Sequence, residues 1–479
     1  MAGSEVGTRG RGLCGPVGQG RPDRYACRDR DEVVQSLALG KRAVMRSPII
    51  ACALGFSIGA VSQNYSWVGT YAGDGSPGLV NGAVDVARFH APYGIAIDDS
   101  AGVMYVADAQ NHCIRRIQNG GVTTLAGSGS QGDQDGQGAN ARFYVPTGVY
   151  YHDGHVYVTD NGNHKVKRID QQGNVVTIAG TGAPGTTNGP GSIAKFYNPV
   201  EVAVRHDGVV FVSDYGNHTI RKIENGVVST FAGNPGNSGD QLGTGINARF
   251  NRPTGIAFDT LEILYVADQM NHKVKVISST GVVSLLAGNG NQASVDGLGP
   301  AASFTRPTYM AWDPTGGLMV AEWMGNLIRR ITLQGSVTTV AGTGQVGYFD
   351  GPVLDAMFNA PYGIAVDTRG NAYIGDKENH VVRYLAKEGE SLLNLSDLST
   401  TTPLILHPNP ASSMATVRWS GPSAPATAEL IDARGARVQA DVRRFADRVE
   451  LDVAALPAGL YTVRLSGDAL VGTARLVRD

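Results

Sequence analysis

The feature of this sequence that most constrains its fold is a phrase that recurs six times at a nearly constant interval. Each copy starts with phenylalanine and has proline three residues later, and successive phenylalanines are 54, 53, 54, 54 and 54 residues apart. The copies begin at Phe89, Phe143, Phe196, Phe250, Phe304 and Phe358. Such a constant period indicates a chain built from structural repeats rather than around one conventional core.

Each repeat predicts four short β-strands joined by tight turns. In the first repeat these are residues 94–98, 103–108, 114–117 and 122–126, with turn sequences rich in Asp, Asn and Gly between them. No helical period of apolar residues occurs in the repeat. Four-stranded sheets repeated around an axis are the blades of a β-propeller, so the sequence predicts an all-β fold with six four-stranded blades.

The order of the phrases predicts how the last blade is completed. A phrase of the fourth-strand type, Trp67–Gly73, precedes the first repeat, whereas none follows the repeat that begins at Phe358. We therefore expect the N-terminal strand to close the last blade, which removes exposed strand edges. Glu390–Leu395 is a weaker alternative for this closing strand.

A second phrase, Asp-x-x-Asn-His, follows five of the six phenylalanines by about nineteen residues, and the fifth repeat departs from it with Glu322 and with Gly325-Asn326. With the preceding Pro-x-Gly-Ile/Val-Ala phrase, it resembles the NHL repeat family over roughly residues 66–388. The resemblance implies a six-bladed propeller of a family that mostly binds ligands, with a minority of enzymes. We expect the Asp to cap turn amides and the Asn and His to brace neighbouring blades. The motif residues are Asp108, Asn111, His112, Asp160, Asn163, His164, Asp214, Asn217, His218, Asp268, Asn271, His272, Asp376, Asn379 and His380.

The first sixty-two residues predict export. Residues 45–62 have one positive charge, a short apolar run and small residues before Gln63, which is typical of a secretory signal peptide. Translation is expected to start at Met45, with residues 1–44 an annotation error or a disordered extension. An alternative is a lipoprotein cleavage site at Cys52. The mature propeller is then expected to occupy residues 63–395, without a transmembrane segment.

The C-terminal part predicts a second, smaller domain. Residues 396–403 are a polar linker, and residues 404–479 contain alternating strands that fit a small β-sandwich. Residues 408–411, 431–435 and 456–461 resemble the C-terminal sorting domain of the Bacteroidetes type IX secretion system. The resemblance implies the secretion machinery as a partner, export through the periplasm, and a secreted or cell-surface location. An ordinary adhesive β-sandwich is the alternative.

Charge and residue spacing argue against several classes of function. The 40 basic and 42 acidic residues give a formal net charge of −2, so a nucleic-acid partner is not expected. The motif histidines are one repeat apart and do not converge on one point, so we predict no metal site and no cofactor. Residues 133–138 faintly resemble a calcium loop but lack its distal Glu, which favours a Gly-rich turn.

Candidate binding residues lie where the first strands begin, on the face that carries the Asn-His turns and the long connections between repeats. The opposite face has turns that we expect to be too short to shape a pocket. Residues at the first-strand starts, and residues that break the repeat, form the candidate set: Tyr93, Thr147, Glu201, Thr254, Tyr309, Glu322, Trp323 and Tyr362.

These residue types favour binding over catalysis. Rings and hydroxyls suit sugars or peptides. A single carboxylate lacks the paired titrating groups that acid–base catalysis normally needs, so no catalytic residue is predicted. We therefore expect a monomeric secreted or surface protein that binds an extracellular glycan, peptide or protein. An extracellular lyase or hydrolase related to amidating lyases or lactonases, and a structural adhesin, are the alternatives.

Overall fold

The computed structural model describes residues 65–387 and, with gaps, residues 404–478. Four predictions lie outside the described residues: the 1–44 extension, the 45–62 signal peptide, the 396–403 linker and the alternative closing strand at Glu390–Leu395. The two described parts are treated separately below. Among the described residues, no helix is long and apolar enough to cross a membrane.

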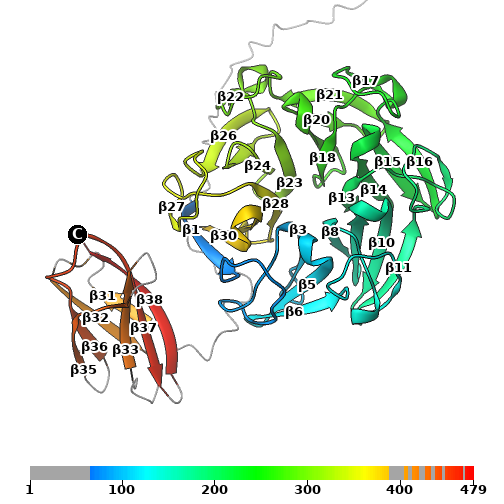
Figure 1. The fold of residues 1–479 in the computed structure, drawn as a ribbon. Coiled ribbons are helices and arrows are strands. Elements are labelled where there is room, and N and C mark those ends of the chain that lie inside the picture. The colour runs from blue at the N-terminus through cyan, green and yellow to red at the C-terminus, as the bar shows by residue number, and fades with distance from the viewer. Residues whose placement is uncertain are drawn as a thin grey trace, which may run out of the picture. The chain divides into compact units, whose positions relative to one another are not determined.

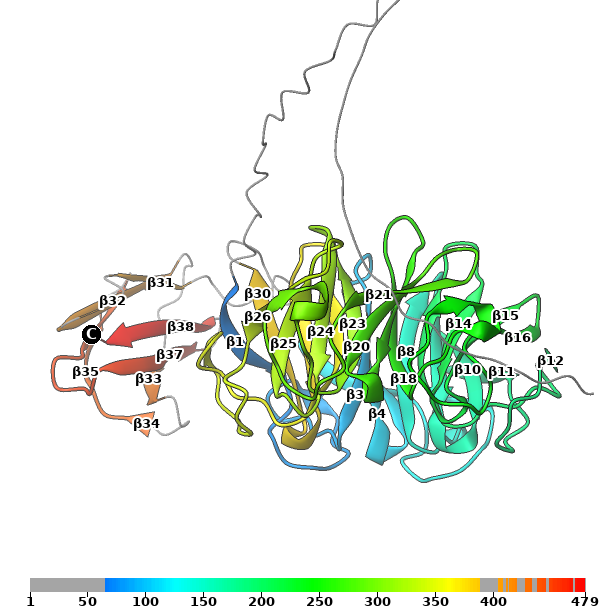
Figure 2. The same cartoon turned by 90° about the horizontal axis from the view of Figure 1, so that it is seen from above.

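Residues 65–387 form six antiparallel sheets that lie around one central axis (Figure 1). Their strands run roughly along that axis, as the turned view in Figure 2 shows. We number the sheets by repeat, so that sheet 1 contains β2 to β6. The predicted all-β class and the six sheets are confirmed.

Each sheet contributes one strand to the centre, and the other strands follow outward. The innermost strands are β3 (Pro92–Asp98), β8 (Pro146–His152), β13 (Pro199–Val204), β18 (Pro253–Phe258), β23 (Pro307–Asp313) and β28 (Pro361–Val366). The second strands are β4 (Val103–Asp108), β9 (His155–Asp160), β14 (Val210–Asp214), β19 (Leu264–Asp268), β24 (Gly317–Glu322) and β29 (Ala372–Asp376). The third strands are β5 (Cys113–Gln118), β10 (Lys165–Asp170), β15 (Thr219–Glu224), β20 (Lys273–Ile277), β25 (Leu327–Ile331) and β30 (Val381–Lys387). The fourth strands are β6 (Gly121–Ala126), β11 (Asn174–Ala179), β16 (Val227–Ala232), β21 (Val282–Ala287), β26 (Ser336–Ala341) and β1 (Tyr65–Ala72).

The expectation of four-stranded blades is wrong by one short strand. Each sheet has a fifth, outermost strand of two residues that pairs with the fourth strand. These strands are β2 (Gly82–Ala83), β7 (Gly136–Gln137), β12 (Gly189–Pro190), β17 (Gly243–Thr244), β22 (Gly297–Leu298) and β27 (Gly351–Pro352). They lie in the long connection that precedes each innermost strand, so every connection first crosses the outer edge of the next sheet. Two residues are too few to give an alternating apolar pattern.

The N-terminal strand completes the sixth sheet, as the order of the phrases predicts. β1 pairs with β30 from Tyr65 opposite Lys387 to Ala72 opposite Val382. On its other side β1 pairs with β27. The first and last described strands of this part of the chain are therefore neighbours in one sheet (Figure 1).

A buried polar cluster holds the turn between the second and third strands. In sheet 1, Asp108 accepts hydrogen bonds from the backbone amide of His90 at 2.7 Å and from Asn111 at 2.8 Å. Its carboxylate also pairs with the fully buried Arg115 at 2.7 Å, and this guanidinium lies 5.0 Å from the centre of the Phe89 ring. The expected capping of the turn amides by Asp is wrong: Asp108 makes no side-chain hydrogen bond to the amides of its own turn, and the amide that it accepts belongs to His90, just before the innermost strand. The cluster also contains a buried cation that our sequence analysis missed. The corresponding cations are Lys167, Arg221, Lys275, Arg329 and Arg383.

The turn itself is a single 3₁₀ turn that ends in a left-handed histidine. The five such turns are η1 (Ala109–Asn111), η3 (Asn161–Asn163), η4 (Tyr215–Asn217), η6 (Gln269–Asn271) and η8 (Lys377–Asn379). Three further 3₁₀ turns lie in the long connections: η2 (Gly138–Asn140), η5 (Gly245–Asn247) and η7 (Gly299–Ala301).

Each turn histidine contacts the next sheet, as expected for a brace between blades. His112 Nδ1 accepts the backbone N–H of Val145 at 3.2 Å, and His380 of sheet 6 accepts that of Ala91 in sheet 1 at 3.2 Å. The same bond recurs at His164, His218 and His272. The amide donor always immediately precedes the proline that begins the innermost strand of its repeat, and it has a positive φ between 49° and 58°. The histidine bond thus holds a backbone conformation that a residue with a side chain rarely adopts.

Residues 404–478 form two four-stranded sheets around a separate apolar core. One sheet has the order β31 (Leu404–His407), β32 (Met414–Trp419), β36 (Arg448–Asp452), β35 (Asp441–Arg444). The other has the order β34 (Arg437–Val438), β33 (Thr427–Asp432), β37 (Gly459–Gly467), β38 (Leu470–Arg478). Val417, Leu451, Val463 and Leu476 are among the buried core residues. Two sheets around one core agree with the predicted β-sandwich.

Candidate functional site

The central axis has two ends with different chemistry. Each innermost strand begins with proline at the face that carries the 3₁₀ turns and the long connections, which we call the long-loop face. Each ends at the tight turn to the second strand, on the opposite side, which we call the short-turn face. Residues early in the innermost strands therefore meet near the long-loop face, and later residues meet near the short-turn face.

Glu201 and Tyr309 occupy a different position in the repeat from the other candidate residues. When the sheets are aligned on their prolines, these two stand where Gly94, Gly148, Gly255 and Gly363 stand elsewhere. A Cβ added at Gly148 would lie 2.6 Å from the carbonyl oxygen of Val200, and one at Gly255 would lie 2.2 Å from that of Thr308. Four of the innermost strands thus approach their neighbours too closely for a side chain. The expectation that the candidate residues at the first-strand starts form one ring of equivalent positions is corrected. Glu201 and Tyr309 come from the next position of the repeat, and their side chains fill the centre.

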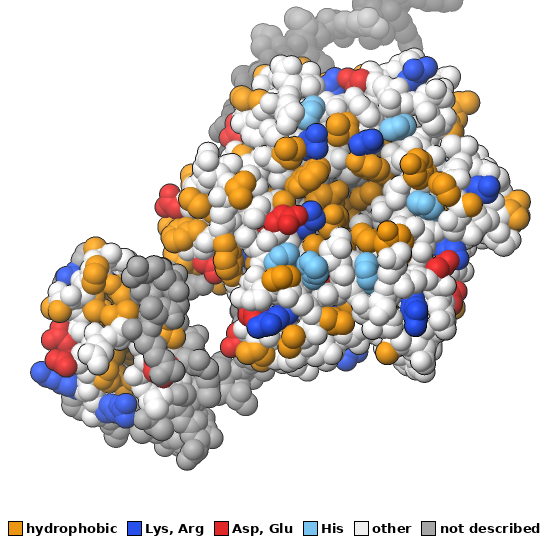
Figure 3. Space-filling view, in the orientation of Figure 1, with side chains coloured by type: hydrophobic (Ala, Val, Ile, Leu, Met, Phe, Trp, Pro, Cys, Tyr) orange, Lys and Arg blue, Asp and Glu red, His pale blue; other side chains and the backbone are white. Residues whose placement is uncertain are grey.

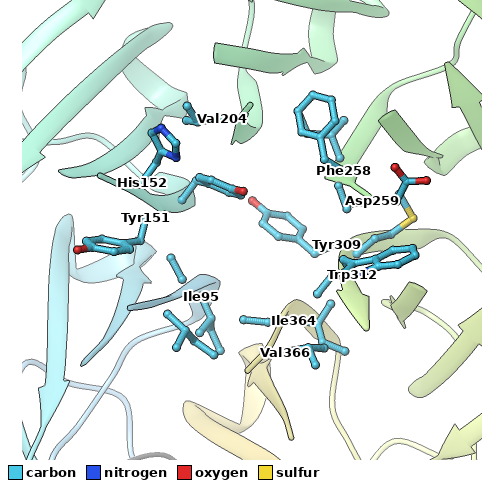
Figure 4. A pocket seen from close by; sticks show the side chains of 18 of the residues that line it. Ile95, Tyr151, His152, Val204, Phe258, Asp259, Tyr309, Trp312, Ile364 and Val366 are labelled. Atoms are coloured by element: carbon cyan, nitrogen blue, oxygen red, sulfur yellow. The ribbon is translucent and has the colours of Figure 1, made fainter. Parts of the chain in front are cut away.

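The centre of the axis is closed by aromatic side chains. Tyr309 crosses the centre from β23 and donates its hydroxyl to the carbonyl oxygen of Val200 in β13 at 2.8 Å (Figure 4). Its ring lies 5.4 Å from that of Tyr362. Both rings are buried, with exposed fractions of 2% and 8%, and burial raises the pKa of both phenols well above their usual range. These two tyrosines therefore separate the two ends of the axis.

The candidate threonines belong to the packing between sheets. Thr147 donates its hydroxyl to the carbonyl oxygen of Val200 in the next sheet at 2.9 Å. Thr254 lies within 3.3 Å of the Pro307 carbonyl oxygen. Both are buried, so their hydroxyls are occupied by neighbouring backbone. A ligand-binding role for them stays a prediction.

Glu322 is also part of the packing, and its departure from the repeat has a local cause. Its carboxylate is fully buried and contacts Arg329 and Ser294, and it accepts the backbone N–H of Thr305 at 3.1 Å. Gly325 stands where the other repeats have Asn, and a Cβ there would lie 2.3 Å from Glu322 Oε2. The longer acid thus fills the space that the Asn side chain fills elsewhere. Asn326 replaces the histidine and accepts the backbone N–H of Ala360 at 3.0 Å.

Aromatic rings and one lysine gather around the axis on the long-loop face. The Tyr93 and Tyr362 rings are 4.5 Å apart, and the Trp323 ring is 6.0 Å from Tyr362. Lys377 Nζ lies 5.5 Å from the centre of the Tyr93 ring and 6.0 Å from that of Trp323. Tyr93, Trp323 and Lys377 are half-buried, and Tyr215 packs partly buried against the same cluster. We call Tyr93, Tyr215, Trp323, Tyr362 and Lys377 the aromatic mouth.

The surface around the aromatic mouth is hollowed and apolar. Figure 3 shows hydrophobic side chains around a hollow at the centre of the six sheets, with histidines spaced around it. Tyr93, Tyr215 and Trp323 are only half-buried, so part of each side chain reaches the surface. Such rings suit stacking against a flat apolar surface.

Tyr215 and Lys377 are the members of the aromatic mouth that our sequence analysis missed. Both immediately follow the acidic residue of the second phrase, as Trp323 does. The six residues at this position are Ala109, Asn161, Tyr215, Gln269, Trp323 and Lys377. The residue at this position varies within an otherwise regular phrase, and this variation was the signal available in the sequence. The position lies at the start of the turn between the second and third strands.

The short-turn face holds a cavity, which corrects the expectation that its turns cannot shape one. The cavity has a volume of about 840 Å³ and is lined by the second halves of all six innermost strands. Its walls include Ile95, Val204, Phe258, Trp312 and Ile364, which surround Tyr309 in Figure 4. The short turns do not prevent a cavity, because the strands form its walls. Glu201 and Tyr309 lie at its inner end.

The carboxyl group of Glu201 is buried without a counter-charge. It is 6% exposed, and its Oε1 accepts the backbone N–H of Val202 at 3.1 Å. None of the ion pairs in the described part of the chain involves it. Burial raises the pKa of Glu201 well above its usual range, which favours the neutral acid.

The loop that resembled a calcium site is occupied by protein cations. Asp133 pairs with Lys165 at 2.6 Å and with the buried Lys167 at 3.2 Å. Asp135 accepts the backbone N–H of Thr177 at 2.7 Å. Within residues 65–387 and the described parts of 404–478, no three His, Cys, Asp or Glu side chains cluster as metal ligands would.

Comparisons with known proteins agree with both parts of the chain. Residues 405–478 match the family described as secretion system C-terminal sorting domain, and residues 143–169 match the NHL repeat. Over 65% of its length the chain is 26% identical to NHL repeat-containing protein 2 of Gallus gallus, of which it covers 48%. It is also 26% identical to protein SUPPRESSOR OF QUENCHING 1, chloroplastic, of Arabidopsis thaliana, and covers 32% of that protein. The chain thus spans about half, or less, of the length of these curated relatives.

Two solved structures share the fold. A protein of unknown function from Bacteroides thetaiotaomicron superposes with a TM-score of 0.53 at 21% identity, over 67% of this chain and 76% of that one. An auxiliary nutrient binding protein from the same organism gives a TM-score of 0.53 at 18% identity and the same coverage. At these identities the likeness establishes the fold alone.

The repeats, the six sheets and these matches define an NHL-repeat β-propeller protein. Its C-terminal part is a sorting domain of the type IX secretion system, which directs export to the cell surface or into the medium.

Proposed function

We propose that this chain is an exported binding protein that recognises a ligand on the long-loop face, through the aromatic mouth. The observation that carries the proposal is the gathering of half-buried rings and one lysine around the axis at that face. Ring faces offer stacking surface to sugars and extended peptides, and the lysine adds a hydrogen-bond donor.

The partners of Lys377 fix its place in the aromatic mouth. It pairs with Glu378 at 2.5 Å, and its side chain is 16% exposed. Burial alone would lower its pKa, but the contacts with Tyr93 and Glu378 outweigh burial and raise the pKa, so the ammonium group stays charged. A charged donor held between two rings favours a ligand with several hydroxyl or carbonyl acceptors, such as a glycan or a peptide.

We also propose that the six sheets form a closed ring in solution. Two kinds of contact support closure: the pairing of β1 with β30, and the hydrogen bond from Ala91 in sheet 1 to His380 in sheet 6. A closed ring would keep the aromatic mouth rigid, because the residues of the aromatic mouth come from four different sheets.

The experiment that tests the binding proposal is an array screen with the exported chain. Purified protein is applied to glycan and peptide arrays, beside a variant in which Trp323 is replaced by alanine. Specific signals that are lost in Trp323→Ala support recognition at the aromatic mouth. Signals that persist unchanged in this variant would place the binding elsewhere.

Trp323 and Tyr93 are better probes of binding than the two buried tyrosines. Tyr309 and Tyr362 close the centre of the axis, and replacing such a buried ring by alanine typically costs about 3–5 kcal/mol of stability. Trp323 is only half-buried, so its replacement is expected to change binding more than folding.

A further inference from the structure

The cavity on the short-turn face contains an acid, Glu201, that takes part in none of the ion pairs among the described residues. The ionisable groups that interact with Glu201 are the phenols of Tyr150, Tyr309 and Tyr362, which are all neutral. Moving a carboxylate into such surroundings without a cation is costly, so natural proteins rarely keep one without a purpose. Glutamine or glycine at this position of the repeat would avoid that cost, and glycine stands there in four of the six sheets.

The walls of the cavity combine apolar surface with aromatic rings. Tyr150, Tyr151, Phe258 and Trp312 line it together with aliphatic residues from every innermost strand (Figure 4). Aromatic faces attract cations, most strongly where water is excluded. The volume of about 840 Å³ lies within the range of sites for small organic molecules.

The charged side chains at the rim of the cavity are mostly acidic. Asp99, Asp259 and Glu262 line the cavity, and Asp367 lines it as well but is fully buried and paired with Arg369 at 3.2 Å. Arg205 is the one lysine or arginine among the lining residues described. Arg205 is already paired with Asp207 at 2.5 Å and lies 4.0 Å from Glu262. His206 contacts Glu262 as well. This rim therefore favours the entry of a cation over that of an anion.

We propose that the cavity on the short-turn face is a second binding site, which takes a small organic cation: an amine with an apolar body, whose ammonium group pairs with Glu201. The site is separate from the aromatic mouth, because Tyr309 and Tyr362 close the axis between them. When the amine binds, the Glu201 carboxyl releases its proton to the solvent. The resulting carboxylate then accepts a hydrogen bond from the ammonium group, and the apolar body lies against the walls.

The competing possibility for the same cavity is a neutral ligand that accepts a hydrogen bond from the protonated Glu201. The two differ in charge and in proton release. A matched set of probes separates them: phenethylamine as the cation, 2-phenylethanol as the neutral analogue and 3-phenylpropionate as the anion. Butylamine and decylamine extend the amine series to smaller and larger bodies.

The test is isothermal titration calorimetry of the exported chain and of Glu201→Gln, which keeps the shape of the neutral acid. We expect at least one amine to bind the wild-type protein. Its affinity for Glu201→Gln should be lower by about 30-fold or more. The alcohol should bind both proteins equally and more weakly than the amine, and the anion should not bind. Trp323→Ala should leave amine binding unchanged.

A second measurement in the wild-type protein keeps the test independent of the variant's folding. Titrations in buffers of different ionisation enthalpy report the protons released on binding. About one proton per bound amine is expected near neutral pH, because the neutral Glu201 must ionise. The proposal is overturned if amine and alcohol bind equally without proton release, or if no amine binds wild type more tightly than Glu201→Gln.

Discussion

At every junction between neighbouring sheets, one imidazole or amide acceptor holds a backbone N–H in a strained loop. Five of the six acceptors are histidines, and the sixth is Asn326. A histidine can accept through Nδ1 only while that nitrogen carries no proton. Partial burial lowers the pKa of all five histidines, which favours this neutral form. The brace between the sheets is therefore sensitive to acid.

The first prediction follows from this sensitivity. A base whose folded-state pKa is lowered contributes stability that is complete above its unfolded pKa, near 6.5, and is lost as the pH falls below that value. A double variant, His218→Asn and His380→Asn, should therefore lose less free energy of unfolding than wild type between pH 7.5 and pH 5. The measurement is urea unfolding at both pH values. The buried aspartates, whose pKa values burial raises to about 6 in Asp108 and Asp214, are common to both proteins. An equal pH dependence in the two proteins would refute the role of the histidines.

The fifth repeat offers a test of how side chains substitute for one another. Gly325→Asn alone should destabilise the protein, because its Cβ would lie 2.3 Å from Glu322 Oε2. Glu322→Asp alone should also destabilise it, because the shorter acid leaves space beside Gly325. The double variant restores the arrangement of the other repeats and should recover about 1–3 kcal/mol relative to the sum of the single changes. Urea unfolding of the four proteins measures this coupling, and strictly additive effects would contradict the packing explanation.

The residue patterns predicted where the candidate site lies, but not which of its residues share a position in the repeat. Tyr93, Tyr362 and Trp323, all selected from the sequence, meet at the aromatic mouth. Glu201 and Tyr309 were placed in the same ring, although alignment on proline puts them in the glycine register. That one-residue difference separates Glu201 and Tyr309, which enter the centre, from Thr147 and Thr254, which pack between sheets, and strand periodicity alone gave no reason to separate them.

At the scale of elements, β1 is the strand that completes the sixth sheet. It contributes buried side chains, including Tyr65, Val68 and Tyr71, and lies between β30 and β27. Deleting residues 63–73 should lower the free energy of unfolding by about 5 kcal/mol or more, since each large buried apolar side chain contributes about 1.5–3 kcal/mol. The uncovered edge of β30 should also promote aggregation.

Thermal unfolding and light scattering test the role of β1. The control lacks residues 1–62 and keeps β1, and it should melt like the exported protein. A melting curve of the 63–73 deletion that matches this control would mean that β1 does not hold the sixth sheet together.

The regular elements were predictable from the sequence, and the exceptions have physical causes. The period of the phenylalanine phrase predicted six sheets, and the count of fourth-strand phrases predicted the position of β1. The two-residue outer strands were missed because they are set by pairing with the fourth strand of their sheet rather than by an apolar pattern. The cavity was missed because its walls are formed by six strands together, which no single repeat reveals.

At the scale of the whole molecule, export should remove both ends of the chain. The bulk of the unanchored protein is predicted to begin near Gln63 and to lack residues 404–479, because the sorting domain acts during secretion. Intact-mass spectrometry of the culture medium measures both ends. Residues 1–44 or the Asp479 terminus on most of the secreted protein would contradict this prediction.

The two sites that we propose lie at opposite ends of one axis, separated by Tyr309 and Tyr362. Trp323 stands at the long-loop end and Trp312 at the short-turn end, and both are half-buried. The two tryptophans therefore provide matched variants, each a control for the other site.

The most direct test of the central claim, ligand recognition at the aromatic mouth, is the affinity of these two variants for an array-selected glycan or peptide. We expect Trp323→Ala to bind about tenfold more weakly or worse, because it removes a stacking ring, and Trp312→Ala to bind like wild type. Loss of affinity in Trp312→Ala with none in Trp323→Ala would contradict the claim and place recognition on the short-turn face.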